Sequence, residues 1–356
     1  MEKTTNHEEQ IKDFAKPKFS FASVFFYLLL VALGVFIYLN FTQLKSFLSY
    51  LRQINIFWLV MALVTQVITY VFVAMIFGYL MKHFGCKNAV SRFNLFKAAI
   101  VSFFLTNLVP TGGISGQGYL IYFFQKRNLP KNVSFLLAVL ETLTYYFAHF
   151  VFAIFLVFYL FFSKIKLGGI LYPVSLFGIF GFIFMEILVL SLTSKRIMLY
   201  LERQSQHNRF VGFFWKRLNI VEERFSHEEW ESPFEFLKNQ KQHLFQPLIF
   251  QILIFFADAL TILFLFYGFN FSINFLTVLA GFVLTKIVSM ISFSPGGLVF
   301  FEGAMLLFYS AFSVPGQLAL IVTLMFRFLS FWLPLPFGLF FYRQFFKSDD
   351  RIIPQN

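Results

Sequence analysis

The chain holds few of the residues that soluble enzymes use for catalysis, metal binding or cross-linking. A single cysteine, Cys86, occurs among its 356 residues, which excludes an internal disulfide and any cysteine-based metal cluster. Only 13% of the residues are charged, and the polar segments contain no Walker motif, no Cys/His cluster and no Ser/His/Asp set. We therefore expect no cofactor and no metal site.

Apolar residues dominate instead, with 58% hydrophobic and 22% aromatic side chains. This composition predicts an all-α polytopic membrane protein. Residues 1–20 are polar and no small-residue cleavage site follows the first apolar run, so we expect an uncleaved anchor there. Apolar runs of about twenty residues predict six full spans. These are residues 21–40, 56–80, 133–162, 168–193, 245–269 and 317–342.

Two further apolar regions, residues 93–124 and 274–312, are interrupted by glycine and proline. Each is long enough for two short helices with a turn between them, so we predict two re-entrant hairpins and eight membrane segments in all. Backbone groups freed at such breaks survive only inside protein or along a polar cavity. A matched pair of interrupted segments, one in each half, points to a transporter's binding site.

The residues at the two breaks are our candidate substrate-binding residues. Short helices whose N-termini point to the middle of the membrane suit an anion such as phosphate, and glycine allows a close backbone approach. Simple helix breaking for packing remains an alternative. The candidates are Asn107, Pro110, Gly112, Gly113, Ser115, Gly116 and Gln117 in the first region and Ser294, Pro295, Gly296 and Gly297 in the second.

The distribution of Lys and Arg predicts the orientation. With two hairpins and a cytoplasmic N-terminus, 23 of the 29 basic residues fall on the cytoplasmic side and four fall outside. Both termini are then cytoplasmic, and we expect the plasma membrane. The net charge of +12 follows from this topology, so it does not indicate a nucleic-acid partner.

The same topology predicts inverted repeats, because one hairpin enters from the inside and the other from the outside. Glu141 lies 11 residues after Pro130, and Arg327 lies 12 residues after Pro315, at matching places in the two halves. The predicted organisation is a tail (1–20), a first repeat (21–162), the first span of a second repeat (163–193), a connector (194–245), the rest of the second repeat (246–342) and a tail (343–356).

The connector at residues 194–245 mixes charged and apolar residues, which predicts amphipathic helices on the cytoplasmic membrane face. Ser232, Pro233 and Glu235 predict a helix start with a capping box. Contact with anionic lipid or a partner enzyme is one interpretation, and a solvated connector is the other.

Ionisable residues inside membrane segments are the main candidates for a role in the mechanism, because a charge at a helix centre costs about 2.5–3.5 kcal/mol even on the gentler insertion scale. Lys286 and Glu302 each lie eight residues from Ser294, so we expect them to pair across the second hairpin. A Glu141–Arg327 pair is the second expectation. Structural salt bridges and substrate contacts both remain open for these pairs. The full set is Glu141, His149, Glu186, Asp258, Lys286, Glu302 and Arg327.

Two segments resemble a known family. Residues 294–302 contain Pro-Gly-Gly followed by Glu302, and residues 325–338 contain Arg327, Trp332 and Gly338. With residues 107–110 and 138–142, they resemble the transmembrane (flippase) region of lysylphosphatidylglycerol synthases, over roughly residues 20–343. The sequence departs from that family's pattern at Gln117, where a Glu is expected, and at Leu120 or Ile121, where an Arg is expected.

The resemblance implies movement of a lipid between leaflets. We expect a flippase for an anionic phospholipid, an aminoacylated phospholipid or a lipid-linked glycan, with a membrane lipid as substrate. The family includes phosphatidylglycerol lysyltransferases, but only residues 343–356 follow the last span, so we do not expect that enzyme activity. The alternatives are a membrane subunit of such a synthase and a scaffold for a cytoplasmic glycosyltransferase. A cytoplasmic lipid-modifying partner and an oligomer are both compatible with the sequence.

Overall fold

The computed structural model describes residues 53–108, 113–163, 168–194, 232–290, 297 and 300–349. Every regular element in these ranges is a helix, as the sequence predicts. The predicted span 21–40 and most of the connector lie outside the described residues. The chain divides after Ile54 into two units, and all helices discussed below belong to the second unit.

Five helical segments in the described ranges are long and apolar enough to cross a membrane. They coincide with five of the six predicted spans. A helix is the expected form for such a run in lipid, because it satisfies its own backbone hydrogen bonds. They are α4 (Ile56–His83), α7 (Lys131–Ser163), α8 (Gly168–Leu192), α12 (Phe245–Gly268) and the segment that starts with α15 (Gly316–Arg327).

Both interrupted regions form a pair of short helices, as the sequence predicts. The first short-helix pair is α5 (Arg92–Leu108) with α6 (Ile114–Gln125), and the second is α13 (Phe275–Ser289) with α14 (Phe300–Ala311). The two members of each pair contact one another. Gly113 precedes α6 in the left-handed region (φ 95°), which glycine adopts without steric cost. The eight-segment count and the inverted repeats stay predictions.

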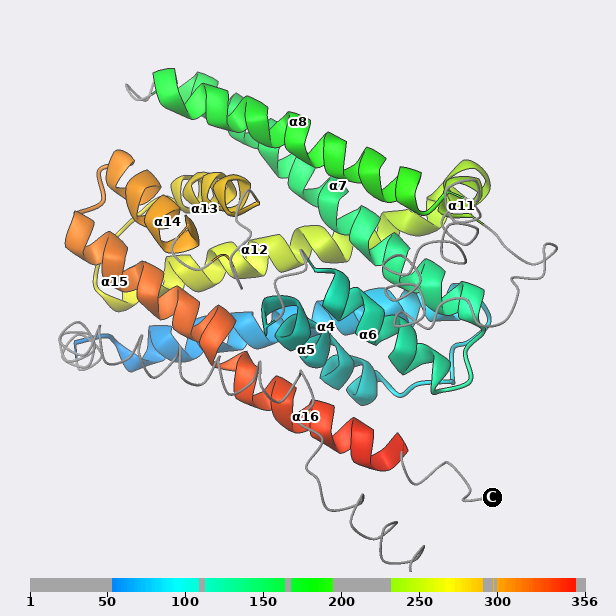
Figure 1. Ribbon diagram of the computed structural model, residues 1–356. Helices are drawn as coiled ribbons and strands as arrows, with labels where there is room; N and C mark the ends of the chain where they lie inside the picture. Colours follow the sequence, from blue (N-terminus) through cyan, green and yellow to red (C-terminus); the bar gives the residue numbers. More distant parts are fainter. Residues whose placement is uncertain are drawn as a thin grey trace, which may run out of the picture. The chain divides into compact units, whose positions relative to one another are not determined.

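α12 is the helix around which the others are arranged. It packs along α4, with which it forms the most extensive helix contact, and it also contacts α7, α13 and α15 (Figure 1). The Asn55 N–H at the start of α4 donates to the Gly268 carbonyl at the end of α12 (2.8 Å), so the two helices are antiparallel. α12 therefore connects the first half of the chain to the second.

The last predicted span, residues 317–342, contains an irregular turn that the sequence analysis did not anticipate. α15 is followed by the π-helical segment η3 (Phe328–Trp332) and then by α16 (Pro334–Asp349). The Leu333 N–H donates to the Phe328 carbonyl (2.8 Å), five residues back. Pro334 and Pro336 have no N–H to donate, so a regular α-helical ladder cannot continue through this point.

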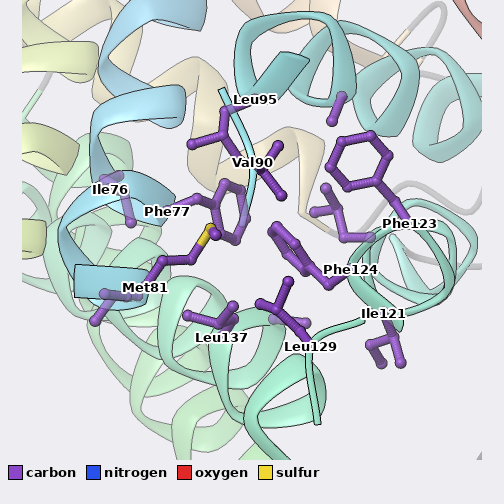
Figure 2. Close-up of a cluster of buried hydrophobic side chains, with 14 of the residues drawn as sticks. Ile76, Phe77, Met81, Val90, Leu95, Ile121, Phe123, Phe124, Leu129 and Leu137 are labelled. Atoms are coloured by element: carbon purple, nitrogen blue, oxygen red, sulfur yellow. The ribbon is translucent and has the colours of Figure 1, made fainter. Parts of the chain in front are cut away.

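An aromatic core lies where α4, α5, α6 and α7 meet. Figure 2 shows the rings of Phe77 and Phe124 at its centre, with ring centroids 5.4 Å apart and Phe123 beside them. Phe345 of α16 belongs to the same cluster. Burying such large rings is the main favourable term that holds the first short-helix pair against α4 and α7.

The described end of the connector packs onto this core. α11 (Pro233–Gln240) begins with the predicted capping box: Ser232 N–H donates to Glu235 Oε2 (2.9 Å), and Glu235 N–H donates to Ser232 Oγ (3.2 Å). Its Phe236 side chain is fully buried in the aromatic core. His83 at the end of α4 hydrogen-bonds Gln240 (2.6 Å). This part of the connector is therefore docked on protein, and the short 3₁₀ helix η1 (Lys241–Leu244) leads from it into α12.

Large apolar side chains are exposed along the outer faces of α4, α7 and α8. Exposure of this extent is unusual for a soluble monomer and is expected where helices contact lipid. The most exposed are Ile56, Phe57, Val60, Phe158, Phe161, Phe162, Phe180, Phe184 and Ile187.

Gly338 marks the closest approach of α16 to α5. A Cβ atom there would overlap Phe104 Cβ, whereas a Cβ at Gly303 of α14 would meet nothing within 4 Å. Gly338→Ala is expected to destabilise the protein by about 1–3 kcal/mol because the overlap forces α16 away from α5. Thermal unfolding in detergent, with Gly303→Ala as the matched control, checks this; equal melting temperatures for the two variants would contradict it.

Candidate functional site

Glu141 of α7 is held by amide side chains from two other helices. Gln117 of α6 donates through Nε2 to Glu141 Oε2 (2.8 Å), and Gln251 of α12 donates through Nε2 to Glu141 Oε1 (3.0 Å). Each carboxylate oxygen thus accepts one hydrogen bond inside the helix assembly, which offsets part of the cost of a carboxylate at this depth. The first short-helix pair, α7 and α12 meet at this residue.

A second polar contact joins α4 to α12. Asp258 lies two helical turns after Gln251, on the same face of α12. Its Oδ1 accepts from Gln66 Nε2 of α4 (3.2 Å). Next to it, the buried hydroxyls of Thr65 and Thr261 hydrogen-bond each other (2.8 Å). A row of polar side chains therefore follows one face of α12 through the interior.

The second half contributes an ion pair between α14 and α15. Arg327 Nε donates to Glu302 Oε1 (2.5 Å), and only 8% of the Arg327 side chain is exposed. The guanidinium also lies over the rings of Phe301 (4.7 Å) and Phe331 (4.5 Å). Phe331 belongs to the π-helical segment η3, so the wide turn after Arg327 helps to enclose its guanidinium.

Lys286 of α13 is a further charged side chain near these groups. Its ammonium interacts electrostatically with the Asp258 carboxylate and with the Arg327 guanidinium. Its Nζ lies 5.1 Å from the centre of the Phe282 ring. We call the connected set Gln66, Gln117, Glu141, Gln251, Asp258, Lys286, Glu302 and Arg327 the buried polar cluster.

Both ion-pair predictions made from the sequence are wrong. Glu302 pairs with Arg327 rather than with Lys286, and Glu141 is bound by Gln117 and Gln251 rather than by Arg327. Residue spacing predicts depth along a helix, but which face a side chain occupies depends on how the helices are rotated and packed. The aromatic rings around Arg327 direct it to α14, a contact that spacing does not reveal.

The two halves nevertheless use equivalent positions. Gln117 and Glu302 each lie seven residues after the proline of their break, Pro110 and Pro295. Each is in the first helical turn after the break and hydrogen-bonds a charged residue 24 or 25 residues further along. This correspondence supports the predicted repeat, with a neutral amide in the first half where the second half has a carboxylate.

The tips of the two breaks are only partly described. Pro110, Gly112, Ser294, Pro295 and Gly296 lie outside the described residues. Gly113 and Gly297 both have positive φ (95° and 68°), in the region that glycine tolerates and other residues rarely adopt. A chain reversal at each break is consistent with these two glycines.

The polar candidates of the first break bind helix α5. Asn107 Nδ2 donates to the Phe103 carbonyl (2.7 Å), and Ser115 Oγ donates to the Leu105 carbonyl (2.8 Å). A Cβ atom at Gly116 would lie 2.6 Å from the Ser102 carbonyl oxygen, so α5 and α6 are in close contact there. The Asn107 bond lies within α5, whereas Ser115 and Gly116 of α6 hold the first short-helix pair together. Among the described candidates of this break, Gln117 alone reaches the buried polar cluster.

Sequence reasoning missed Gln66 and Gln251, and it assigned Asp258 no role. The available signal was an amide within a largely apolar helix, at Gln66 in α4 and Gln251 in α12. Such a side chain is costly in a membrane helix unless it finds a partner. Among the described residues, no group of three or more His, Cys, Asp or Glu side chains is arranged to hold a metal ion.

Removing one partner of the Glu302–Arg327 pair leaves a buried charge without its counter-charge. Glu302→Gln is expected to lower the free energy of unfolding by about 3–5 kcal/mol, whereas the double variant Glu302→Leu with Arg327→Met restores most of it. Unfolding in detergent measures both. Glu186→Gln on α8 is the matched control, because Glu186 is half-buried and makes no hydrogen bond or ion pair with the described residues. An unchanged stability of Glu302→Gln would contradict the prediction.

Comparison with known proteins places this arrangement in a family. The family model described as "Lysylphosphatidylglycerol synthase TM region" matches residues 21–338. A UPF0104 membrane protein of Methanocaldococcus jannaschii is 23% identical over 313 residues, which cover 83% of this chain and 87% of the relative. Another from Pyrococcus horikoshii is 26% identical over 280 residues, which cover 71% and 77%. No solved structure matches the chain at a significant level.

Proposed function

The chain belongs to the lysylphosphatidylglycerol synthase transmembrane-region family, and on this premise we propose that it moves a lipid headgroup between the two leaflets. It is a multi-pass helical membrane protein. The proposed substrate is an anionic phospholipid, an aminoacylated phospholipid or a lipid-linked glycan. The headgroup passes along the buried polar cluster while the acyl or isoprenoid chains stay in the bilayer.

The observation that carries this proposal is the concentration of ionisable groups inside membrane helices. Five of them, Glu141, Asp258, Lys286, Glu302 and Arg327, come from five different helices and join one cluster. Each costs about 2.5–3.5 kcal/mol at a helix centre, so the cluster is expensive to maintain for structure alone. Apolar packing provides stability without that cost, which favours a functional reason for the charges.

The positions of the charges fit a pathway. The cluster includes one side chain from the second helix of each short-helix pair, Gln117 and Glu302. Movement of either pair would therefore change the contacts at the cluster, as expected where a protein opens alternately to the two sides of a membrane. The proposed location is the plasma membrane with cytoplasmic termini, on the basis of the Lys and Arg distribution.

Lys286 fits the recognition of an anionic headgroup. Among the described residues it lies outside ion-pair distance of every carboxylate, in contrast to Arg327, whose charge Glu302 neutralises. A lipid phosphate would supply an ion-pair partner at contact distance, which stabilises a buried ammonium. A cytoplasmic lipid-modifying enzyme is a further proposed partner, with the connector at residues 194–245 as its binding segment.

The test is lipid scrambling in proteoliposomes, followed by dithionite quenching of fluorescent lipids with different headgroups. Glu141→Gln keeps the shape of the side chain but removes its charge. It is expected to slow transport by about tenfold or more, because hydrogen bonds to a charged group are worth more than neutral ones. Glu186→Gln is the control and is expected to transport at the wild-type rate.

Two results would contradict the proposal. Wild-type protein that is folded, by its melting temperature, but scrambles none of these lipids would exclude an autonomous translocator. Equal transport by Glu141→Gln and the wild type would remove the buried polar cluster from the pathway.

A further inference from the structure

The last membrane-spanning segment is divided between the two short-helix pairs. Its first part, α15, contacts α14 of the second pair, and its last part, α16, contacts α5 of the first pair (Figure 1). The π-helical segment η3 lies between the two parts. Among the described helices, no extensive contact joins the two short-helix pairs to each other directly. The last span is therefore a physical link between them.

The end of α15 is bound to both helices of the second pair. The Phe326 ring stacks on Phe301 of α14, with centroids 5.9 Å apart, and it meets Phe282 of α13 edge-on at 5.6 Å. Arg327 adds the buried ion pair with Glu302 of α14. Separating α15 from this pair would expose large rings and leave a buried charge without its partner, and both are costly.

α16 is bound to both helices of the first pair. Gly338 marks its close approach to α5, and Lys97 of α5 donates to Gln344 Oε1 of α16 (3.2 Å). The Phe345 ring packs on Phe123 of α6, with centroids 5.1 Å apart. Each half of the last span is therefore attached to a different short-helix pair.

The backbone between the two halves is weaker than a regular helix. The segment η3 already departs from the α-helical hydrogen-bond ladder. Pro334 and Pro336 have no N–H, so the carbonyls of Ser330 and Trp332, four residues before them, have no donor in the regular α-helical position. Helices bend at π-helical turns and at prolines. Bending at η3 therefore breaks fewer helical hydrogen bonds than bending within α15 or α16.

We propose that η3 is a hinge about which the two short-helix pairs move relative to one another. The first body is α5, α6 and α16, and the second body is α13, α14 and α15. Each short-helix pair carries its own half of the last span. This inference rests on the proposed function, because opening to either side of the membrane requires such a relative movement, and it names the place where the chain bends.

α7 also contacts both pairs, through α6 and α13, but it cannot serve as the joint. It runs from Lys131 to Ser163 as one helix without a proline. A helix of this kind curves gently and does not kink sharply. α7 therefore provides a continuous surface against which the two bodies move, and the bending is left to the last span.

The hinge adjoins the buried polar cluster. Arg327 is the last residue of α15, and the ring of Phe331 in η3 lies 4.5 Å from its guanidinium. Bending at η3 moves this ring relative to the guanidinium, so the enclosure of the buried cation changes with the angle of the hinge. A movement of the two bodies is thereby coupled to a charge in the proposed pathway.

Spin-label distances measure the movement in the full chain, reconstituted in nanodiscs of phosphatidylcholine with and without phosphatidylglycerol. Cysteines replace exposed residues in a Cys86→Ser background. Leu307→Cys with Phe340→Cys joins the two bodies. Phe93→Cys with Phe340→Cys lies within the first body, and Leu307→Cys with Leu320→Cys lies within the second. We expect two populations about 5 Å or more apart for the joining pair and one for each pair within a body.

Straightening the hinge tests its position. Pro334→Ala with Pro336→Ala restores two N–H donors, so it is expected to leave one population for the joining pair and to slow lipid scrambling by about fivefold or more. Pro173→Ala is the matched control, because Pro173 also lies inside a membrane helix, α8, away from η3. It is expected to retain both populations and the wild-type rate.

Distances and transport are read separately, so the two proposals fail in different ways. A single, unchanged distance for the joining pair in every nanodisc overturns the hinge, and so does an equally large change within either body. Two populations that persist after straightening overturn its assignment to η3. Two populations in a wild type that scrambles no lipid support the hinge but contradict the proposed transport.

Discussion

The structure depends on the rule that no polar group within a membrane can rely on water. Arg327 shows how the rule is met: Glu302 neutralises its charge, and the rings of Phe301 and Phe331 lie against its guanidinium. The helices that supply these groups, α14, α15 and η3, are therefore held in one arrangement by a single buried cation. Glu141 likewise holds α6, α7 and α12 in one arrangement, because it accepts hydrogen bonds from the amides of Gln117 and Gln251.

Helix irregularities and the polar cluster belong together in this protein. The π-helical turn follows Arg327 directly and presents Phe331 to it, and prolines at 334 and 336 prevent a regular ladder there. The breaks at the two short-helix pairs likewise place Gln117 and Glu302 in the first turn of the helix that follows each break. Interrupted helices thus coincide with polar side chains of the interior.

Much of the fold could be predicted, because it follows from local chemistry. Apolar runs of sufficient length form helices in lipid whatever surrounds them, and the Ser232–Glu235 capping box is a contact between neighbours in sequence. Glu141, Glu302 and Arg327 could be named as site residues because charge is rare in such runs. Their partners could not, because an amide within an apolar helix shows that a polar partner is needed but not which one. Packing of α12 against α7 brings Gln251 to Glu141, and packing of α4 against α12 brings Gln66 to Asp258.

The sequence by itself determined an all-helical membrane protein, the two interrupted regions and the charged residues that an apolar interior must accommodate. Only the tertiary structure decided that Arg327 pairs with Glu302, that Glu141 is bound by two amides and that the last span is divided between the two short-helix pairs. The physical reason is that spacing along a helix sets the depth of a side chain, whereas rotation about the helix axis is set by contacts with distant segments. The Gln251–Glu141 hydrogen bond joins residues 110 positions apart in the sequence, and the Gln66–Asp258 hydrogen bond joins residues 192 positions apart. No local sequence pattern predicts such contacts.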